Sequence, residues 1–244
     1  MAGHSKWKNI RLHKGKADAQ RGKLFGKLSR ELSVAAKAGG SVDANPRLRL
    51  AVEKAREASM PADNIKRAIQ KGTGELASDS VEEITYEGYG PGGIAVLVET
   101  ETDNRNRTVE KVRTAFSKNG GSMGESGSVA WQFERKGVLS IALKGTDEDA
   151  LLEAALEAGA DDVSREDEEF SVQTSPETVS AVQNALENAG FKVSNIEVGF
   201  IPSNTIELSG ENATKMLRLL DVLEELDDVT NVSANFELAE DVEA

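Results

Sequence analysis

The hydrophobic pattern of this chain changes its period near residue 80. Before that point, apolar residues recur every three or four positions between glycine and proline stops, which is typical of helices. After it, short runs of strand character are separated by longer helical stretches, which is typical of domains that mix strands and helices. We therefore predict an α+β protein that begins with a helical domain.

Three helices are expected in the first part. Leu24, Leu28 and Leu32 recur every four residues and form one apolar helix face. Asn45 followed by Pro46 is typical of a helix start, because an asparagine side chain caps free backbone N–H groups and proline suits the first helical position. The expected helices cover residues 18–38, 46–59 and 61–72.

The remainder predicts two further domains. Residues 137–199 follow the order strand, helix, strand, strand, helix, strand, which is that of a ferredoxin-like fold. The pieces on either side each resemble half of another such sheet, so the simplest packing joins them and inserts the first domain between them. The expected domains are 1–78, basic and helical; 79–135 plus 203–244, discontinuous; and 136–202, inserted and ferredoxin-like.

Three strand predictions define this arrangement. We expect one strand at 128–134 and the next at 137–143, on either side of a domain boundary. A single strand at 231–238 is expected to complete the discontinuous domain.

Charge separates the two parts of the chain as well. Residues 1–74 carry seventeen Lys and Arg against six Asp and Glu, a sum of +11, whereas residues 75–244 carry twelve against thirty-six, a sum of −24. An acidic protein is repelled by polyphosphate, so a basic N-terminal segment is typical of a nucleic-acid contact surface. Nucleic acid is therefore the expected partner.

Composition excludes several other classes. The chain has no cysteine, and only His4 and His13 offer imidazole ligands, so we expect neither a metal nor a cofactor. We found no apolar run long enough to span a membrane and no secretory signal. A cytoplasmic protein without membrane association is expected.

The sequence also argues against an enzyme. Residues 88–93, GYGPGG, fit the dinucleotide-binding pattern G-x-G-x-x-G, but a strand follows them where phosphate binding requires a helix N-terminus, so we predict a turn. Acidic pairs such as Asp227-Asp228 are interpreted as solvated surface charges. No motif brings a nucleophile to its base, and we assign no catalytic residue.

The basic N-terminal segment holds most of the candidate site. Trp7 has little apolar company, so it either stacks on an exposed base or pins the segment to the helical domain. The other candidates here share a positive charge suited to phosphate: Lys6, Lys8, Arg11, Lys14, Lys16, Arg21, Lys23, Lys27 and Arg30.

Two smaller basic clusters complete the candidates. Lys66, Arg67 and Lys71 fall on the polar side of the third helix, where they could dock phosphates. At a later strand-to-helix junction, Asn104 or Asp103 is expected to cap the helix. Arg105 and Arg107 follow as candidate phosphate contacts.

Several long motifs resemble the YebC family, whose mitochondrial relatives include the translational activator of cytochrome c oxidase subunit one. They are MAGHSKWKNI, MPADNIKRAIQKGTGE, YEGYGPGGIAVLVETETDNRNRTVEKVR, GSVAWQF and LEELDDVTNVSANFEL. The resemblance runs from residue 1 to about residue 238. It implies three domains, one helical and two α+β, and, since it begins at residue 1, a bacterial cytoplasmic protein with no mitochondrial presequence.

The resemblance implies one of two roles in gene expression. Family members are described as DNA-binding transcriptional regulators, and some act in translation by relieving ribosome stalling. A basic arm with glycines and one tryptophan suits irregular RNA, and we see no strong dimer seam, which a duplex-DNA reader often needs. We favour a monomeric, ribosome-associated factor that binds ribosomal RNA or tRNA, with a promoter-DNA regulator as the alternative.

Overall fold

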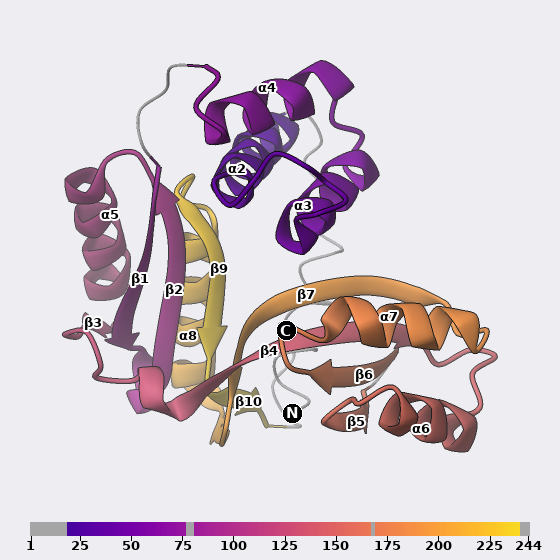
Figure 1. Ribbon diagram of the computed structural model, residues 1–244. Helices are drawn as coiled ribbons and strands as arrows, with labels where there is room; N and C mark the ends of the chain where they lie inside the picture. Colours follow the sequence, from indigo (N-terminus) through magenta and orange to yellow (C-terminus); the bar gives the residue numbers. More distant parts are fainter. Residues whose placement is uncertain (1–18, 77–80, 167–168, 240–244) are drawn as a thin grey trace. The chain divides into compact units, whose positions relative to one another are not determined.

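The computed structural model describes residues 19–76, 81–166 and 169–239, and these form an α+β protein, as predicted (Figure 1). They divide into two compact units. We call residues 19–129 and 214–232, without 77–80, the helix–sheet unit, and residues 130–213 and 233–239, without 167–168, the acidic unit.

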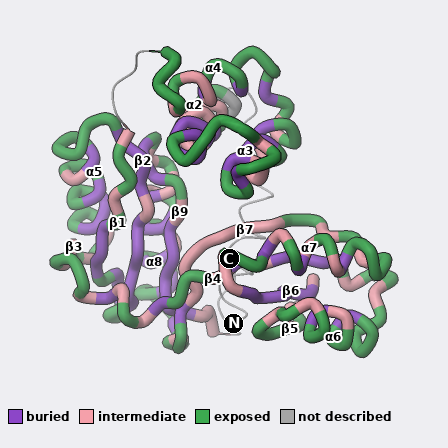
Figure 2. The backbone as a smooth tube through the Cα atoms, viewed as in Figure 1, coloured by how far each residue is buried: buried purple, intermediate pink, exposed green. Residues whose placement is uncertain are grey.

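Three helices open the helix–sheet unit, and they confirm the predicted ones. Their bounds are α2, Ala19–Ala36; α3, Pro46–Glu57; and α4, Ala62–Gly72. Leu32, Leu48 and Ala55 are fully buried in their common core, and Figure 2 shows this inner face in purple. Asn45 accepts a hydrogen bond from the backbone N–H of Leu48 at 3.1 Å, so it is the N-cap that the sequence predicted.

Gly72 lets the end of α4 approach α2 closely. A Cβ atom at this position would lie 2.1 Å from the Ser33 carbonyl oxygen and 2.7 Å from the Ala36 side chain. The backbone of α2 cannot yield easily, because it is held in its own helical hydrogen bonds. A glycine is therefore required here.

We expect Gly72→Ala to lower the free energy of unfolding by about 1–3 kcal/mol through overpacking. Urea denaturation measures the effect. Gly26→Ala is the matched control, because Gly26 lies inside α2 with nothing within 4 Å of an added Cβ. That change is expected to stabilise the helix by about 0.5–1 kcal/mol. Equal stability of the two variants would contradict the close approach of the two helices at Gly72.

The sheet of this unit joins strands from distant parts of the sequence. Its order is β3-β1-β2-β9, with bounds β1, Glu82–Tyr89; β2, Ala95–Thr102; β3, Ser122–Met123; and β9, Val229–Ala234. The helices α5, Arg105–Lys118, and α8, Gly210–Glu224, cover one face of it (Figure 1). A Cβ on Gly88 would touch Phe116 of α5, and one on Gly90 would touch Met216 of α8.

The GYGPGG segment is a turn, as predicted. It connects the antiparallel strands β1 and β2 through the short 3-10 helix η1, Pro91–Gly93. Gly92 and Gly93 have φ values of 78° and 77°, in the left-handed region that glycine adopts without strain. The strand β2 follows the turn directly, at the place where the dinucleotide-binding pattern requires a helix.

The acidic unit contains a second four-stranded sheet of order β5-β6-β4-β7. The strands are β4, Phe133–Ala142; β5, Asp162–Arg165; β6, Glu169–Thr174; and β7, Val193–Pro202. The helices α6, Glu148–Glu157, and α7, Val179–Asn188, pack beside it (Figure 1). This strand order is the ferredoxin-like one predicted for residues 137–199. A separate pair, β8, Ile206–Leu208, and β10, Phe236–Leu238, is parallel.

Two strand predictions were wrong. The predicted strand at 128–134 is replaced by the short 3-10 helix η2, Ala130–Gln132, and the predicted strand at 137–143 begins earlier, as part of the single strand β4. The strand continues through Gly137, where a Cβ would lie 2.8 Å from Val179 of α7. The predicted strand at 231–238 is two strands, β9 and β10, which belong to different sheets. The local sequence pattern does not show which sheet a strand joins. The division into three domains stays a prediction.

Candidate nucleic-acid interface

The basic arm is outside the region that the structure describes. Lys6, Trp7, Lys8, Arg11, Lys14 and Lys16 all precede the first described residue. Arg21 lies in α2, but its side chain is also outside the described part. The roles predicted for these seven residues stay predictions.

Four candidate cations are exposed on the helices. Lys23 lies on α2, and Lys66, Arg67 and Lys71 lie on α4. Ile65 and Ala68, which alternate with these cations along α4, are buried in the helical core. The cations therefore project from the polar side of α4, as the sequence predicted, where a phosphate can reach them.

Two further candidates on α2 contact the protein itself. Lys27 donates a hydrogen bond from Nζ to the carbonyl oxygen of Glu224 at 2.6 Å. Arg30 donates to the carbonyl oxygen of Asp227 and lies 3.7 Å from the Asp228 carboxylate. Glu224 is the last residue of α8, and cations at a helix C-terminus are favourable because the helix dipole is negative there. These two cations therefore anchor α2 to the end of α8.

The last two candidates begin α5. Asn104 caps this helix by accepting from the backbone N–H of Arg107 at 3.0 Å, so Asn104 is the cap of the two that the sequence offered. Arg105 is exposed. Arg107 donates to both carboxylate oxygens of Asp228 at 3.0 Å and to Asp103 at 2.9 Å. Hydrogen bonding to Asp228 is the largest cause that raises the pKa of Arg107.

The interpretation of Asp228 as a solvated surface charge was wrong. Its exposed fraction is only 3%, and it also accepts a hydrogen bond from the Thr108 hydroxyl at 2.9 Å. Its backbone carbonyl accepts from the Glu101 N–H at 2.9 Å. Asp228 thus connects α2, α5 and the sheet. The sequence carries no signal for this, since Asp227 and Asp228 are identical in type and adjacent.

We expect Asp228→Ala to lower the free energy of unfolding by about 1.5–3 kcal/mol, because a buried Thr108 hydroxyl and two arginines lose a charged partner. Asp227→Ala is the matched control, since the side chain of Asp227 is exposed. It should change stability by about 0.5 kcal/mol or less. Thermal unfolding of the two variants side by side checks the difference, and similar melting temperatures would contradict the role given to Asp228.

A second group of charges lies on the sheet, and sequence reasoning missed it. Glu83 and Glu101 are directly opposite one another in the β1–β2 register. Arg47 of α3 contacts the Glu83 carboxylate and lies 3.8 Å from that of Glu101. Two ionised carboxylates at these positions would repel one another, and Arg47 opposes that repulsion.

Glu101 is the most perturbed acid of this group. Its exposed fraction is 4%, and its Oε2 atom has no hydrogen-bond partner among the described residues. Burial, followed by repulsion from Glu31, raises the pKa of Glu101 from 4.5 to about 8, against the opposing effect of Arg47. Glu101 therefore holds its proton near neutral pH.

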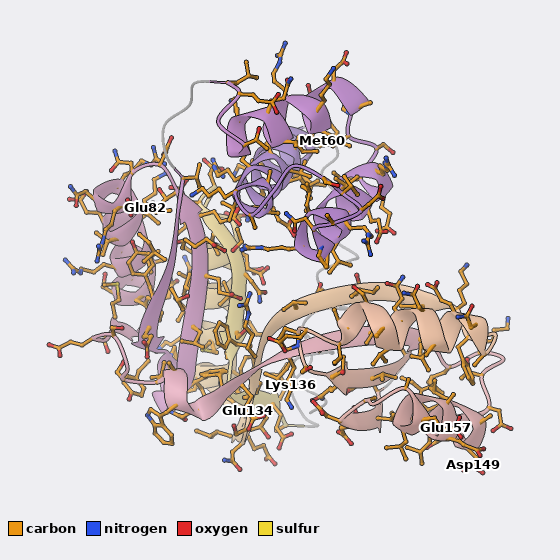
Figure 3. The ribbon with its side chains drawn as sticks, in the orientation of Figure 1. Met60, Glu82, Glu134, Lys136, Asp149 and Glu157 are labelled. Carbon is orange, nitrogen blue, oxygen red and sulfur yellow. The ribbon has the colours of Figure 1, made fainter. Side chains whose placement is uncertain are left out.

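The acidic unit presents a different electrostatic surface. Lys136 on β4 forms ion pairs with Glu134 at 3.6 Å and with Asp161 at 2.8 Å. Figure 3 labels Lys136 and Glu134. Asp149 and Glu157 are exposed on α6 (Figure 3). Within residues 19–76, 81–166 and 169–239, no cluster of three or more potential metal ligands occurs. No helix in these ranges is long and apolar enough to cross a membrane.

Similarity to known proteins identifies the family of this chain. Residues 5–75 match the family described as "TACO1/YebC protein N-terminal domain", and residues 81–236 match "TACO1/YebC second and third domain". A protein of Pelotomaculum thermopropionicum named "Probable transcriptional regulatory protein" is 53% identical over 98% of this chain and 99% of its own length. One of the same description from Geobacter sulfurreducens is 55% identical over 98% and 97%.

A solved structure agrees with the fold as well. The crystal structure of a conserved hypothetical protein from Aquifex aeolicus has a TM-score of 0.85 and 48% identity, and the match covers 94% of this chain and 95% of that one. The two family matches together span most of the sequence. On this evidence the chain is a member of the TACO1/YebC family.

Proposed function

We propose that this protein is a non-catalytic regulator of gene expression that binds RNA at the ribosome through its basic N-terminal domain and relieves stalling. The observation that carries this proposal is the charge distribution, +11 in residues 1–74 against −24 in residues 75–244. A polyanion is attracted to the first part and repelled by the second, so the N-terminal domain is the contact surface that charge favours.

The exposed cations of the helices support this surface. Lys66, Arg67 and Lys71 project from one helix, and Lys23 is exposed on another. The six arm residues and Arg21 are proposed to extend it, and Arg105 is proposed to add a contact from the sheet. Contacts of this kind bind the phosphate backbone and position the protein without reading sequence.

The start of α4 favours RNA over a duplex-DNA reader. In a helix-turn-helix protein, the N-terminal residues of the recognition helix contact base edges in the major groove. Here α4 begins with Ala62 and Asp63, neither of which is the arginine or lysine that most often reads a guanine edge. An arm with glycines and Trp7 suits irregular RNA, where stacking and shape dominate. We propose ribosomal RNA or tRNA as the target and a cytoplasmic monomer as the active form.

The alternative function is a DNA-binding transcriptional regulator. The names of the two bacterial relatives favour it. Both functions need a basic surface, so charge alone does not separate them.

Cross-linking in cells followed by sequencing of the attached nucleic acid separates the two functions. We expect ribosomal RNA or tRNA to be recovered. A variant with Lys66→Glu, Arg67→Glu and Lys71→Glu is the control, and it should recover far less of the same RNA. Enrichment of promoter DNA by the unmodified protein would overturn the translation role in favour of the alternative.

A further inference from the structure

Four cations of the N-terminal helical region, residues 19–76, contact the sheet portion of the same unit. Lys27 and Arg30 reach the carbonyl oxygens at the end of α8, and Arg30 also approaches Asp228. Lys37 donates to the carbonyl oxygen of Val81, just before β1. Arg47 contacts Glu83 and approaches Glu101. We call the interactions of these four cations the docking contacts.

The docking contacts offer the cations oxygen acceptors, as the phosphates of a nucleic acid also do. Each acceptor is a carboxylate or a carbonyl oxygen, and the charged carboxylates are those of Glu83 and Asp228. Lys27 and Arg30 belong to the basic series that the sequence marks for phosphate binding, yet their charged groups contact the end of α8. One cation cannot make full use of both sets of acceptors at once.

These contacts are open to competition. The side chain of Arg30 is 28% exposed, that of Arg47 is 47% exposed and that of Glu83 is 51% exposed. Ion pairs that water reaches contribute little each, because solvent screens them and both side chains lose freedom. A polyanion that meets several cations together also gains the free energy of counterion release. It can therefore displace the docking contacts.

We propose that the docking contacts are an autoinhibitory latch, in which carboxylates and carbonyls of the sheet portion occupy cations of the N-terminal helical region until RNA takes their place. The latch rests on the proposed function, since it requires RNA as the competitor. Docking of the helices on the sheet and RNA binding oppose one another. Weakening the latch tightens RNA binding, and locking the latch weakens it.

The first test removes one latch carboxylate. Glu83→Gln breaks the pair with Arg47, whereas Glu110→Gln removes the same charge from an exposed position on α5. The probe is a single-stranded RNA of about 20 nucleotides taken from ribosomal RNA, with affinity measured by fluorescence anisotropy. We expect Glu83→Gln to bind about 3- to 5-fold more tightly than the unmodified protein, which is the upper end of the effect of losing one exposed ion pair. Glu110→Gln should differ by about twofold or less. Equal affinity of the two variants would overturn the latch.

The second test locks the latch with a cross-link. The chain has no natural cysteine, so the reagent reacts only with the introduced ones. In the Arg47→Cys/Glu83→Cys protein, a short bismaleimide joins the two positions across the docking contacts. We expect the cross-linked form to bind the RNA probe at least about tenfold more weakly than the same protein before cross-linking. Unchanged affinity after cross-linking would also overturn the latch.

A distance measurement follows the opening directly. Fluorophores on Glu57→Cys at the end of α3 and Lys118→Cys at the end of α5 report on the two sides of the docking contacts. Saturating RNA should lower the energy transfer, and bound RNA with unchanged transfer counts against the latch. If the protein binds RNA equally well before and after cross-linking, the latch is rejected and the proposed function is not. No RNA binding by the unmodified protein or by Glu83→Gln rejects the proposed function together with the latch.

Discussion

A protein that lacks residues 1–16 is expected to lose RNA binding while keeping the stability of the unmodified chain. These residues hold six of the proposed contacts, and their sequence shows no apolar helical period. The contacts are Lys6, Trp7, Lys8, Arg11, Lys14 and Lys16. Filter binding measures the affinity, and thermal unfolding measures the stability. Unchanged affinity in the truncated protein would show that the site lies elsewhere.

Salt tests the mechanism of the same interaction. If the arm and Arg105 together meet about six to ten phosphates, affinity should fall roughly 10³- to 10⁵-fold between 50 and 200 mM salt. Lys14→Ala should weaken binding and lower the slope of log affinity against log salt by about one. A weak salt dependence would contradict a binding mode dominated by phosphate.

Trp7→Ala is the control that carries no charge. It should cost about 1–3 kcal/mol of binding if the indole stacks on a base, and it should leave the salt slope nearly unchanged. The competing role as a structural pin gives the opposite result. In that case the variant binds normally and melts at a lower temperature.

Glu101→Gln is expected to be the substitution that most changes how stability depends on pH. A folded-state pKa of about 8 against an ordinary pKa of 4.5 means that the folded protein keeps a proton that the unfolded chain has lost over this range. The folded state binds more protons there, so its stability falls as pH rises from about 4.5 to about 8. At 1.36 kcal/mol for each pKa unit, the loss reaches roughly 5 kcal/mol.

A glutamine side chain does not ionise, so the Glu101→Gln variant should avoid this loss. We expect it to match the unmodified protein near pH 5 and to exceed its stability by several kcal/mol near pH 9, as followed by urea denaturation across this range. Glu110→Gln, at an exposed position, should follow the unmodified protein at every pH. Parallel pH profiles for all three proteins would show that Glu101 ionises normally.

Some of the candidate site could be predicted from sequence because local pattern defines it. The cap at Asn104, the polar side of α4 and the turn at residues 88–93 depend on neighbours within a few residues. Long-range partners are a different matter. Arg107 was predicted as a phosphate contact, and no local pattern indicated that Asp228, 121 residues away, hydrogen-bonds to it.

By itself the sequence determined the α+β class, the three N-terminal helices, the ferredoxin-like order of β4 to β7 and the separation of charge, because periodicity, capping residues and composition are local properties of the chain. Only the tertiary structure decided that β4 is one strand, that the expected final strand is split between two sheets, and that Asp228 and Glu101 are buried. Which edge a strand joins and which of two adjacent acids loses its water depend on contacts between segments far apart in sequence. Such contacts bury Asp228 among its hydrogen-bond donors and leave Asp227 exposed to solvent.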